Sequence, residues 1–552
     1  MSQDTKSQIT IENYTETHVR VFSEDLGIEK EISEYFTFYV PGAHFTPQYR
    51  ARIWDGKTRL YDLLRKTVYT GLIPYVRKFA FERGYTVSEI GFPKYIEPIT
   101  EEEIKTFIDS LNITSKNDPD LLVRDYQYNA VYSALKRRRA LLLSPTASGK
   151  SLIMYSILRW YSTLKNNKKC LIIVPTTNLV EQLYKDFDDY STKNGWKVDA
   201  HIQKLYAGFS KELTKNILIT TWQSIYKLPK SFFEKFDVVF GDEVHKFKAR
   251  SLITIMEKCN NVKFRIGTTG TIDNSKINKL VLEGLFGIVE KVTTTSDLID
   301  QKKLADLKII CLLLSYDDIS REGRKNNVYS DEIDWLVSCD KRNNYITNLA
   351  LNCKGNTLIL YQYVKKHGIP LYEKLNRLEK KYNKKIYLIS GDTIVSDREQ
   401  VRDIAADTNN CVIVASYGTF STGVNIPSIE NIILASPIKS KILNLQSIGR
   451  GLRLNKNKTT CNLFDIADDL SYKKWKNHTY RHLLSRMQTY DEEKFNYSLV
   501  EVKLDASNIN TTESNKIEWR FCYCKIVDWW INISDSFKRR RKRNYYWIPI
   551  FT

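Results

Sequence analysis

Two series of short apolar runs constrain most strongly what this 552-residue chain can fold into. The first series follows Arg124 and contains ALLLS, CLIIVP, NILITT, FDVVFGDE and KFRIGTT; the second contains NTLILY, KIYLIS, NCVIVAS and NIILAS. Continuous apolar runs that end in small or polar residues are typical of buried parallel strands with functional loops at their carboxyl ends. The pattern predicts two α/β domains in tandem, joined between Asp273 and Ser338.

The chain is too long for one hydrophobic core, so further folding units are expected around these two. Runs such as HVRVF and YFTFYV, mixed with turn residues, predict a small α+β domain before a polar linker near residues 115–120. After about residue 468 the pattern becomes helical and aromatic. We therefore expect an N-terminal α+β domain (1–118), two α/β domains (119–295 and 296–470) and a mainly helical C-terminal region (471–552).

Composition narrows the compartment and the class of partner. The formal net charge of +20 favours polyanionic partners through counterion release, although a basic surface also suits a membrane or plain solubility. No apolar run approaches the roughly 18 residues of a membrane span, and the polar N-terminus lacks a secretory signal. Nine scattered cysteines, whose one close pair Cys522 and Cys524 has no second cluster nearby, indicate reduced thiols in a cytoplasmic compartment and no zinc site.

The segment SPTASGKS (144–151) lies between the apolar run ALLL and the helical run LIMYSILRW. A loop that enters a helix N-terminus presents backbone N–H groups and the positive helix dipole to phosphate oxygens. Lys150 is then expected against the β- and γ-phosphates of ATP, and the Ser151 hydroxyl on Mg²⁺. Ser144 replaces the first glycine of the phosphate-loop pattern, and a chance glycine-rich turn is the alternative. The predicted cofactor-binding residues here are Thr146, Ser148, Gly149, Lys150 and Ser151.

Two further segments carry charges that phosphoryl transfer requires. In DEVH (242–245), Asp242 is expected to hold Mg²⁺ and Glu243 to orient and deprotonate the attacking water; a solvated acidic pair is the alternative. In QSIGRGLR (446–453), Arg450 and Arg453 share one helix face, and Gln446 is assigned to the same catalytic set. A guanidinium from a neighbouring domain stabilises charge on the γ-phosphate and makes hydrolysis depend on domain closure. Two surface arginines are the alternative.

The ordered set resembles superfamily-two helicases, in which ATP lies between two RecA-like folds. PTTNLVEQ (175–182), TTWQS (220–224), GTTGT (267–271), residues 360–368, ISGDT (389–393) and ASYGTFSTGVNIP (415–427) carry the resemblance. It implies that Gln127 reads the adenine, that Gly423 adds to the ATP site and that nucleic acid crosses both domains. Where many relatives have Ser/Thr-Ala-Thr, this chain has Thr269-Gly270-Thr271. By motif position the nucleic-acid contacts are Thr177, Trp222, Gln223, Ser390, Gly391, Thr419 and Thr422.

A basic segment in the N-terminal domain, YRARIWDGKTRLYD (49–62), contains the hairpin signal Asp55-Gly56. If these two residues form the turn, alternation places Ala51, Ile53, Thr58 and Leu60 on a core face. The opposite face suits phosphate contact and base stacking, with a solvated charged face as the alternative. That face carries Arg50, Arg52, Trp54, Lys57, Arg59 and Tyr61.

This basic segment, the motor motifs and DEEKFNYSL (491–499) together look like the UvsW helicase family of tailed phages, over about residues 15–504. The resemblance implies an ATP-dependent enzyme of DNA recombination, repair and replication that unwinds branched DNA and R-loops and migrates junctions. It also implies DNA as partner, with RNA in hybrids, no membrane, a monomer or weak oligomer, and the infected-cell cytoplasm. The tail after Leu504 departs from the family, and its KRRRKR run suits either phosphate binding or solvation.

Three rival functions share some of these features. An RNA-directed or transcript-release motor has the same ATPase motifs, and a restriction-system DNA translocase would add a nuclease-like cluster that is not evident. A nucleic-acid-binding scaffold with an inactive ATPase belongs to another class. The intact set Lys150, Asp242, Glu243, Arg450 and Arg453 argues against the scaffold.

Overall fold

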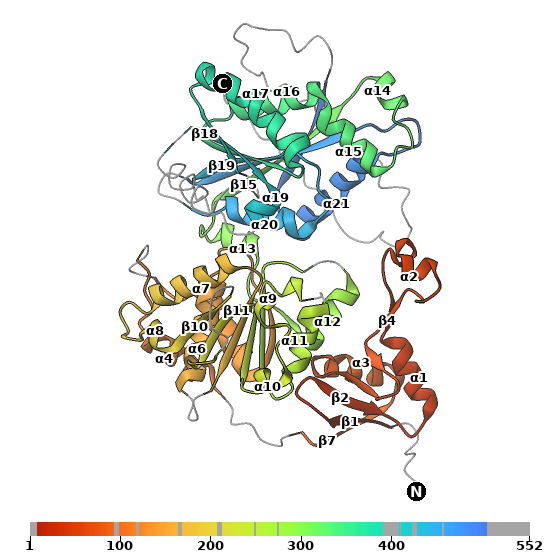
Figure 1. Ribbon diagram of the computed structural model, residues 1–552, viewed down its shortest axis with the longest axis vertical. Helices are drawn as coiled ribbons and strands as arrows, with labels where there is room; N and C mark the ends of the chain where they lie inside the picture. Colours follow the sequence, from red (N-terminus) through yellow and green to blue (C-terminus); the bar gives the residue numbers. More distant parts are fainter. Residues whose placement is uncertain are drawn as a thin grey trace, which may run out of the picture.

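The two series of apolar runs form two seven-stranded parallel sheets in the computed structural model, as predicted (Figure 1). The structure describes residues 8–92, 99–116, 121–163, 168–206, 212–247, 250–272, 275–389, 408, 410–421, 428–454 and 458–504. The C-terminal KRRRKR run and the Cys522–Cys524 pair therefore lie outside the described residues. Within those ranges, the helices are all too short or too polar to cross a lipid bilayer.

The first sheet has the strand order β10-β11-β9-β12-β13-β8-β14. Its central strands are buried between helices on both faces, which explains why their sequences are continuously apolar, whereas the edge strands are only partly buried. The strands are β8 (Arg139–Leu143), β9 (Cys170–Val174), β10 (Ile202–Leu205), β11 (Ile217–Thr221), β12 (Val238–Asp242), β13 (Phe264–Thr269) and β14 (Val289–Lys291). The helices are α5 (Asp125–Arg137), α6 (Lys150–Thr163), α7 (Thr177–Tyr190), α8 (Val198–His201), α9 (Trp222–Ile225), α10 (Lys230–Phe233), η4 (Val244–Lys246), α11 (Arg250–Lys258) and α12 (Lys276–Phe286).

The second sheet has the order β17-β18-β16-β19-β20-β15-β21 and stands above the first in Figure 1. Its strands are β15 (Asp306–Ser315), β16 (Asn356–Tyr361), β17 (Lys385–Ile389), β18 (Cys411–Ser416), β19 (Ile429–Leu434), β20 (Thr460–Asp469) and β21 (Tyr497–Lys503). The helices are α13 (Thr295–Asp300), α14 (Asp318–Glu322), α15 (Tyr329–Ser338), α16 (Asp340–Asn352), η5 (Val364–Gly368), α17 (Ile369–Tyr382), α19 (Tyr417–Ser421), α20 (Lys441–Gly451) and α21 (His478–Glu492).

The region after residue 470 is only partly the helical extension that the sequence suggests. Helix α21 agrees with that expectation, but β21 pairs in parallel with β15 and completes the second sheet. Arg486 of α21 forms a buried ion pair with Asp465 of β20 at 2.8 Å. Residues up to Leu504 therefore belong to the second α/β domain. The sequence pattern did not predict this strand, because its pairing partner β15 lies far away in the sequence.

The N-terminal domain is a five-stranded mixed sheet, with the strand order β5-β6-β2-β1-β7, covered by α1 and α3. A separate two-stranded ribbon pairs β3 with β4. The strands are β1 (Gln8–Asn13), β2 (His18–Phe22), β3 (Thr37–Tyr39), β4 (Lys57–Arg59), β5 (Tyr61–Asp62), β6 (Thr67–Tyr69) and β7 (Thr86–Ile90). The helices are α1 (Leu26–Tyr35), η2 (Ala43–Phe45), α2 (Pro47–Arg50), η3 (Thr70–Leu72) and α3 (Ile73–Arg83).

The N-terminal domain and the first α/β domain share one continuous core. A Cβ at Gly71 would lie 2.0 Å from the carbonyl oxygen of Glu283 in α12, so only glycine allows this contact. Tyr69 and Tyr75 donate hydrogen bonds across the same interface to Glu257 and Glu283, at 2.8 and 2.7 Å. Helix α4 (Glu101–Ser110), which precedes residue 119, packs into the core of the first α/β domain.

The predicted hairpin around Asp55-Gly56 is wrong. Gly56 does adopt a left-handed φ of 75°, but the residues before it form α2 and a turn, so Arg52 does not pair with Arg59. Strand β4 pairs instead with β3, where Tyr39 lies opposite Lys57. Thr46 and Pro47 explain the difference, because an N-cap hydroxyl followed by proline starts a helix at this point. Ile53, predicted to be in the core, is 80% exposed.

Candidate active site

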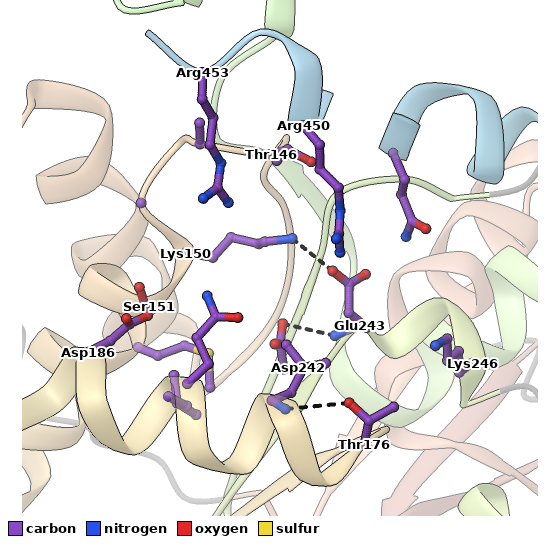
Figure 2. Close-up of a pocket in the computed structure, with 17 residues that line it drawn as sticks. Thr146, Lys150, Ser151, Thr176, Asp186, Asp242, Glu243, Lys246, Arg450 and Arg453 are labelled. Carbon is purple, nitrogen blue, oxygen red and sulfur yellow. Dashed lines mark hydrogen bonds and ion pairs between the residues drawn. The ribbon is translucent and has the colours of Figure 1, made fainter. Parts of the chain in front are cut away.

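A cavity of about 310 Å³ lies where the carboxyl ends of the first sheet face α20 of the second domain. Its lining includes most of the predicted ATP-site residues and draws on both α/β domains (Figure 2). Ser148 and Gln127 lie behind the lining. The lining residues that carry the argument are Thr146, Gly149, Lys150, Ser151, Asp186, Asp242, Glu243, Gln446, Arg450 and Arg453.

The phosphate loop between β8 and α6 is held in a curved shape by its backbone. Ala147 and Gly149 adopt left-handed φ angles of 65° and 82°. Gly149 is required at its position, since a Cβ there would lie 2.2 Å from the Gln127 amide nitrogen. Ser144, which replaces the usual first glycine, has no left-handed φ, and its hydroxyl shares a 2.5 Å hydrogen bond with that of Ser148. The loop therefore keeps its shape without a glycine at position 144.

Gln127 supports this loop from behind. Its amide nitrogen donates to the Ser148 carbonyl at 2.9 Å, and its amide oxygen accepts from the Arg124 backbone N–H at 2.9 Å. Both ends of the amide are thus engaged inside the protein, and the side chain is only 4% exposed. The adenine contact expected of Gln127 stays a prediction, whereas its contact with the phosphate loop is a structural fact.

Lys150 and Glu243 form an ion pair of 3.1 Å at the centre of the cavity (Figure 2). Burial lowers the pKa of Lys150, but the carboxylates of Glu243 and Asp242 outweigh burial and raise it above its ordinary value. Burial raises the pKa of Glu243, yet Lys150 and His245 outweigh burial and hold it well below its usual range. Glu243 also has a left-handed φ of 51°, a strained backbone conformation that is common at functional sites. The pair keeps a charged carboxylate and a charged amine ready at neutral pH.

Asp242 and Ser151 offer the oxygen atoms that Mg²⁺ prefers. One oxygen of the Asp242 carboxylate accepts hydrogen bonds from the Thr268 hydroxyl at 2.8 Å and the Glu243 N–H at 2.9 Å, which orients the group. Burial, followed by the charge of Glu243, raises the pKa of Asp242. A cation next to this carboxylate would offset both effects, so the donor set fits a divalent metal.

The second domain supplies two cations opposite the phosphate loop, Arg450 from α20 and Arg453 from just after its end. Both line the cavity (Figure 2), but Arg453 lies beyond the helix, so the two do not share the single helix face that the i,i+3 spacing predicts. Burial and the charge of Arg453 lower the pKa of Arg450 to about 10, so the Arg450 guanidinium remains charged at neutral pH. The buried Nε of Arg453 has no hydrogen-bond partner among the described residues. An anionic ligand between the domains would satisfy this unpaired donor.

The two domains touch directly beside these arginines. A Cβ at Gly449 would lie 2.7 Å from the Cβ of Thr146 in the phosphate loop. The absence of a side chain at position 449 therefore sets how closely α20 approaches the phosphate loop.

Some site residues were not expected from the sequence. His245 connects two motifs, because its Nδ1 lies 3.2 Å from the Glu243 carboxylate and 3.0 Å from the Thr269 hydroxyl. The hydroxyl retained at Thr269 thus contacts the acidic motif. Asp186 lines the cavity from α7, and burial raises its pKa to about 6 while a hydrogen bond from Ser151 opposes the shift. The DEVH motif could have indicated His245 as a site residue, but no local sequence pattern indicates Asp186.

The predicted nucleic-acid contacts divide into three groups. Thr177, at the start of α7, and Gln223 are exposed, and Trp222 is partly exposed. Thr419 is buried, and its hydroxyl is hydrogen-bonded to that of Ser416 at 2.8 Å, so its side chain faces the interior of the second domain. Three further predicted contacts, Ser390, Gly391 and Thr422, lie outside the described residues, as does Gly423, which was predicted for the ATP site.

The basic residues of the N-terminal domain lie mostly at the surface. Arg50, Arg52 and Arg59 are exposed, whereas Lys57 is partly exposed. Trp54 is partly buried and donates its indole N–H to the Lys57 carbonyl at 2.8 Å.

Two tandem parallel-sheet domains with a phosphate loop, an acidic pair and facing arginines define a RecA-like motor of the helicase class. Family models agree: "Type III restriction enzyme, res subunit" matches residues 120–274 and "Helicase conserved C-terminal domain" matches 340–455. The model "DNA helicase UvsW, N-terminal" matches residues 8–89. The chain is 33% identical to the ATP-dependent DNA helicase uvsW of Enterobacteria phage T4, over 88% of this chain and 98% of that protein. The chain therefore belongs to the UvsW family of DNA helicases.

More distant relatives share the motor. The DNA 3'-5' translocase XPB2 of Sulfurisphaera tokodaii is 26% identical over 68% of this chain and 85% of its own length. The DNA-bound structure of the Type ISP restriction-modification enzyme LlaBIII has a TM-score of 0.51 at 14% identity, over 80% of this chain and 36% of that chain. This likeness concerns the fold alone.

Proposed function

We propose that this chain uses ATP and Mg²⁺ to unwind and branch-migrate branched DNA and R-loops in phage recombination, repair and replication. The observation that carries the proposal is the cavity in which Lys150 and Glu243 of one domain face Arg450 and Arg453 of the other. Hydrolysis at such a site depends on how the domains are placed, which is the property that a motor needs. The family supplies the DNA substrate, and the cytoplasm of an infected cell is the corresponding place of action.

The Lys150–Glu243 ion pair suggests how ATP binding activates Glu243 as a base. The γ-phosphate competes for Lys150, whose raised pKa keeps it charged for this contact. Released from Lys150, the Glu243 carboxylate can accept the proton of the attacking water. Ser151 and Asp242 would hold Mg²⁺, which would neutralise part of the phosphate charge when bound. Glu243 is thus restrained by its partner until substrate separates the two charges.

Arg450 and Arg453 then make hydrolysis sensitive to domain closure. Arg450 comes from α20 and Arg453 from the residues just after it, so both reach the γ-phosphate only when the second domain approaches the phosphate loop. Stabilisation of charge by such an arginine is worth about 10³–10⁵ in rate in related nucleotide hydrolases. His245 contacts both Glu243 and Thr269, and we infer that it transmits changes at Glu243 to β13, which contains Thr269.

The test is steady-state ATPase activity against single-stranded, duplex, forked and four-way DNA, an R-loop and RNA, with Lys150→Ala as the control. Strongest stimulation by branched DNA or R-loops, abolished in the control variant, is the expected result. Stimulation by RNA alone would replace the proposal with an RNA-directed motor. Absence of hydrolysis with every polymer would leave a nucleic-acid-binding scaffold.

A further inference from the structure

An arm projects from the N-terminal domain beside the motor. We use "the arm" for residues 37–59: the β3–β4 ribbon and the connection that contains η2 and α2. Figure 1 shows α2 at its far end, extended away from the N-terminal sheet in the direction of the second α/β domain. The arm's base contacts the first α/β domain, where Nζ of Lys276 in α12 lies 5.0 Å from the ring centre of Phe38, and the domain that carries the arm shares one core with that α/β domain. The arm therefore moves with the first motor domain.

The end of the arm exposes large apolar side chains. Phe45 is 69% exposed and Ile53 is 80% exposed, although the sequence pattern predicts Ile53 in a core. Single exposed apolar residues are common on proteins, but two large ones at the end of one projection indicate a contact surface.

This exposure does not result from a loose loop. The backbone N–H groups of Ile53 and Trp54 both donate to the Gln48 carbonyl, at 3.0 and 3.3 Å. The Trp54 indole N–H donates to the Lys57 carbonyl. The Tyr49 ring packs against Gly56 so closely that a Cβ at position 56 would lie 2.9 Å from a ring carbon. These contacts fix the backbone that carries Ile53 before binding, which lowers the entropic cost of a contact.

The charge around the apolar side chains selects the kind of partner. Asp55 is the single acidic residue of the arm, and Arg59 neutralises it at 2.5 Å. Arg50 and Arg52 remain exposed on either side of Ala51. In DNA, phosphates lie close to the flat faces of the bases. The cations of the arm can contact the phosphates, and the aromatic and branched aliphatic side chains can contact the bases, as apolar wedges in DNA-binding proteins do at base steps.

We propose that the arm is a branch-point wedge, in which Phe45 and Ile53 contact the outermost base pair of a duplex while Arg50 and Arg52 hold its phosphates. This inference rests on the proposed function and specifies the structure of its substrate, a junction between duplex and single strands. The motor domains pull the single strand, and the arm, fixed to the first of them, meets the duplex that is being opened.

The test compares the double variant Phe45→Ala, Ile53→Ala with a matched control on the same domain. Leu64→Ala with Phe81→Ala removes two side chains that are 96% and 86% exposed and lie off the arm. Each protein is assayed for ATPase activity on single-stranded DNA, for unwinding of a fork, and for fluorescence of a 2-aminopurine in the terminal base pair at the fork.

The arm variant is expected to keep its single-stranded-DNA ATPase within about twofold, to unwind the fork about tenfold more slowly and to lose the fluorescence increase on binding. The control variant and the wild type should behave alike. Unchanged fork unwinding in the arm variant overturns the wedge, as does an equal fall in ATPase on single strands, which would show a general binding role. Sedimentation that shows the arm variant to break a dimer, with unwinding intact, also overturns it. A wild type without DNA-stimulated ATPase refutes the proposed function itself.

Discussion

Substitution of Gly449 by alanine tests whether close contact between the two domains sets the rate of hydrolysis. The new methyl carbon would lie 2.7 Å from the Cβ of Thr146, whereas carbon atoms in contact prefer about 3.5–4.0 Å. Thr146 cannot yield easily, because Pro145 precedes it and Ala147 follows with a φ of 65°. Helix α20 must therefore withdraw by about 1 Å, and a misplacement of that size can lower a rate by about 100-fold.

The same change should not weaken the fold. Alanine is favoured over glycine within a helix by about 1 kcal/mol, so the stability of the second domain should be unchanged or slightly higher. In the Gly449→Ala enzyme, the ATPase kcat with saturating DNA should therefore fall while the thermal midpoint of unfolding stays the same or rises slightly. Gly451→Ala is the matched control on the same helix: its Cβ would lie 2.3 Å from Ile432 inside the second domain, so its main effect should be a lower midpoint. A Gly449→Ala enzyme with kcat within about threefold of wild type would refute the reasoning.

Three other perturbations probe the site and the core. Glu243→Gln should retain ATP binding, measured with a fluorescent nucleotide, and lose about 10²–10⁴ in kcat; normal turnover would exclude Glu243 as the base. Arg486→Ala should leave Asp465 buried and unpaired and lower the free energy of unfolding in urea by about 3–5 kcal/mol; a loss below about 1 kcal/mol would contradict this. Burial, with Arg342, lowers the pKa of His367 to about 3, so below pH 6.5 the unfolded chain binds a proton that the folded chain does not. Stability should therefore fall by about 1.4 kcal/mol per pH unit between pH 6.5 and 4 through this histidine, and His367→Gln should remove that part of the slope in urea titrations.

The ATP site was largely predictable because its chemistry is local. A phosphate loop needs a strand, a turn and a helix N-terminus in succession, and ALLL followed directly by SPTASGKS and LIM provides all three. The pairing of Arg450 with this loop was predicted from motif order, and the structure places both in one cavity. The position of Asp186 could not be predicted, because it depends on how α7 packs beside α6.

The N-terminal segment shows where local patterns fail. Alternation and Asp55-Gly56 predict a short hairpin, yet Thr46 and Pro47 start a helix, and β4 finds β3 as a more distant partner. The alternation predicts Ile53 as a core residue of a strand. No strand forms at this position, and the side chain is exposed.

The sequence by itself determined the two parallel sheets and the phosphate loop, which follow from periodicity and spacing within about twenty residues, where backbone geometry limits the alternatives. The order of the motor motifs, through its resemblance to the helicase family, indicated which charged side chains would meet, and the structure brings Lys150, Glu243 and Arg450 to one cavity. Only the tertiary structure decided that β21 closes the second sheet, that His245 contacts Thr269 and that Gly449 meets Thr146. Such contacts join residues far apart in the chain, and their formation depends on the packing of whole domains, which no local pattern encodes.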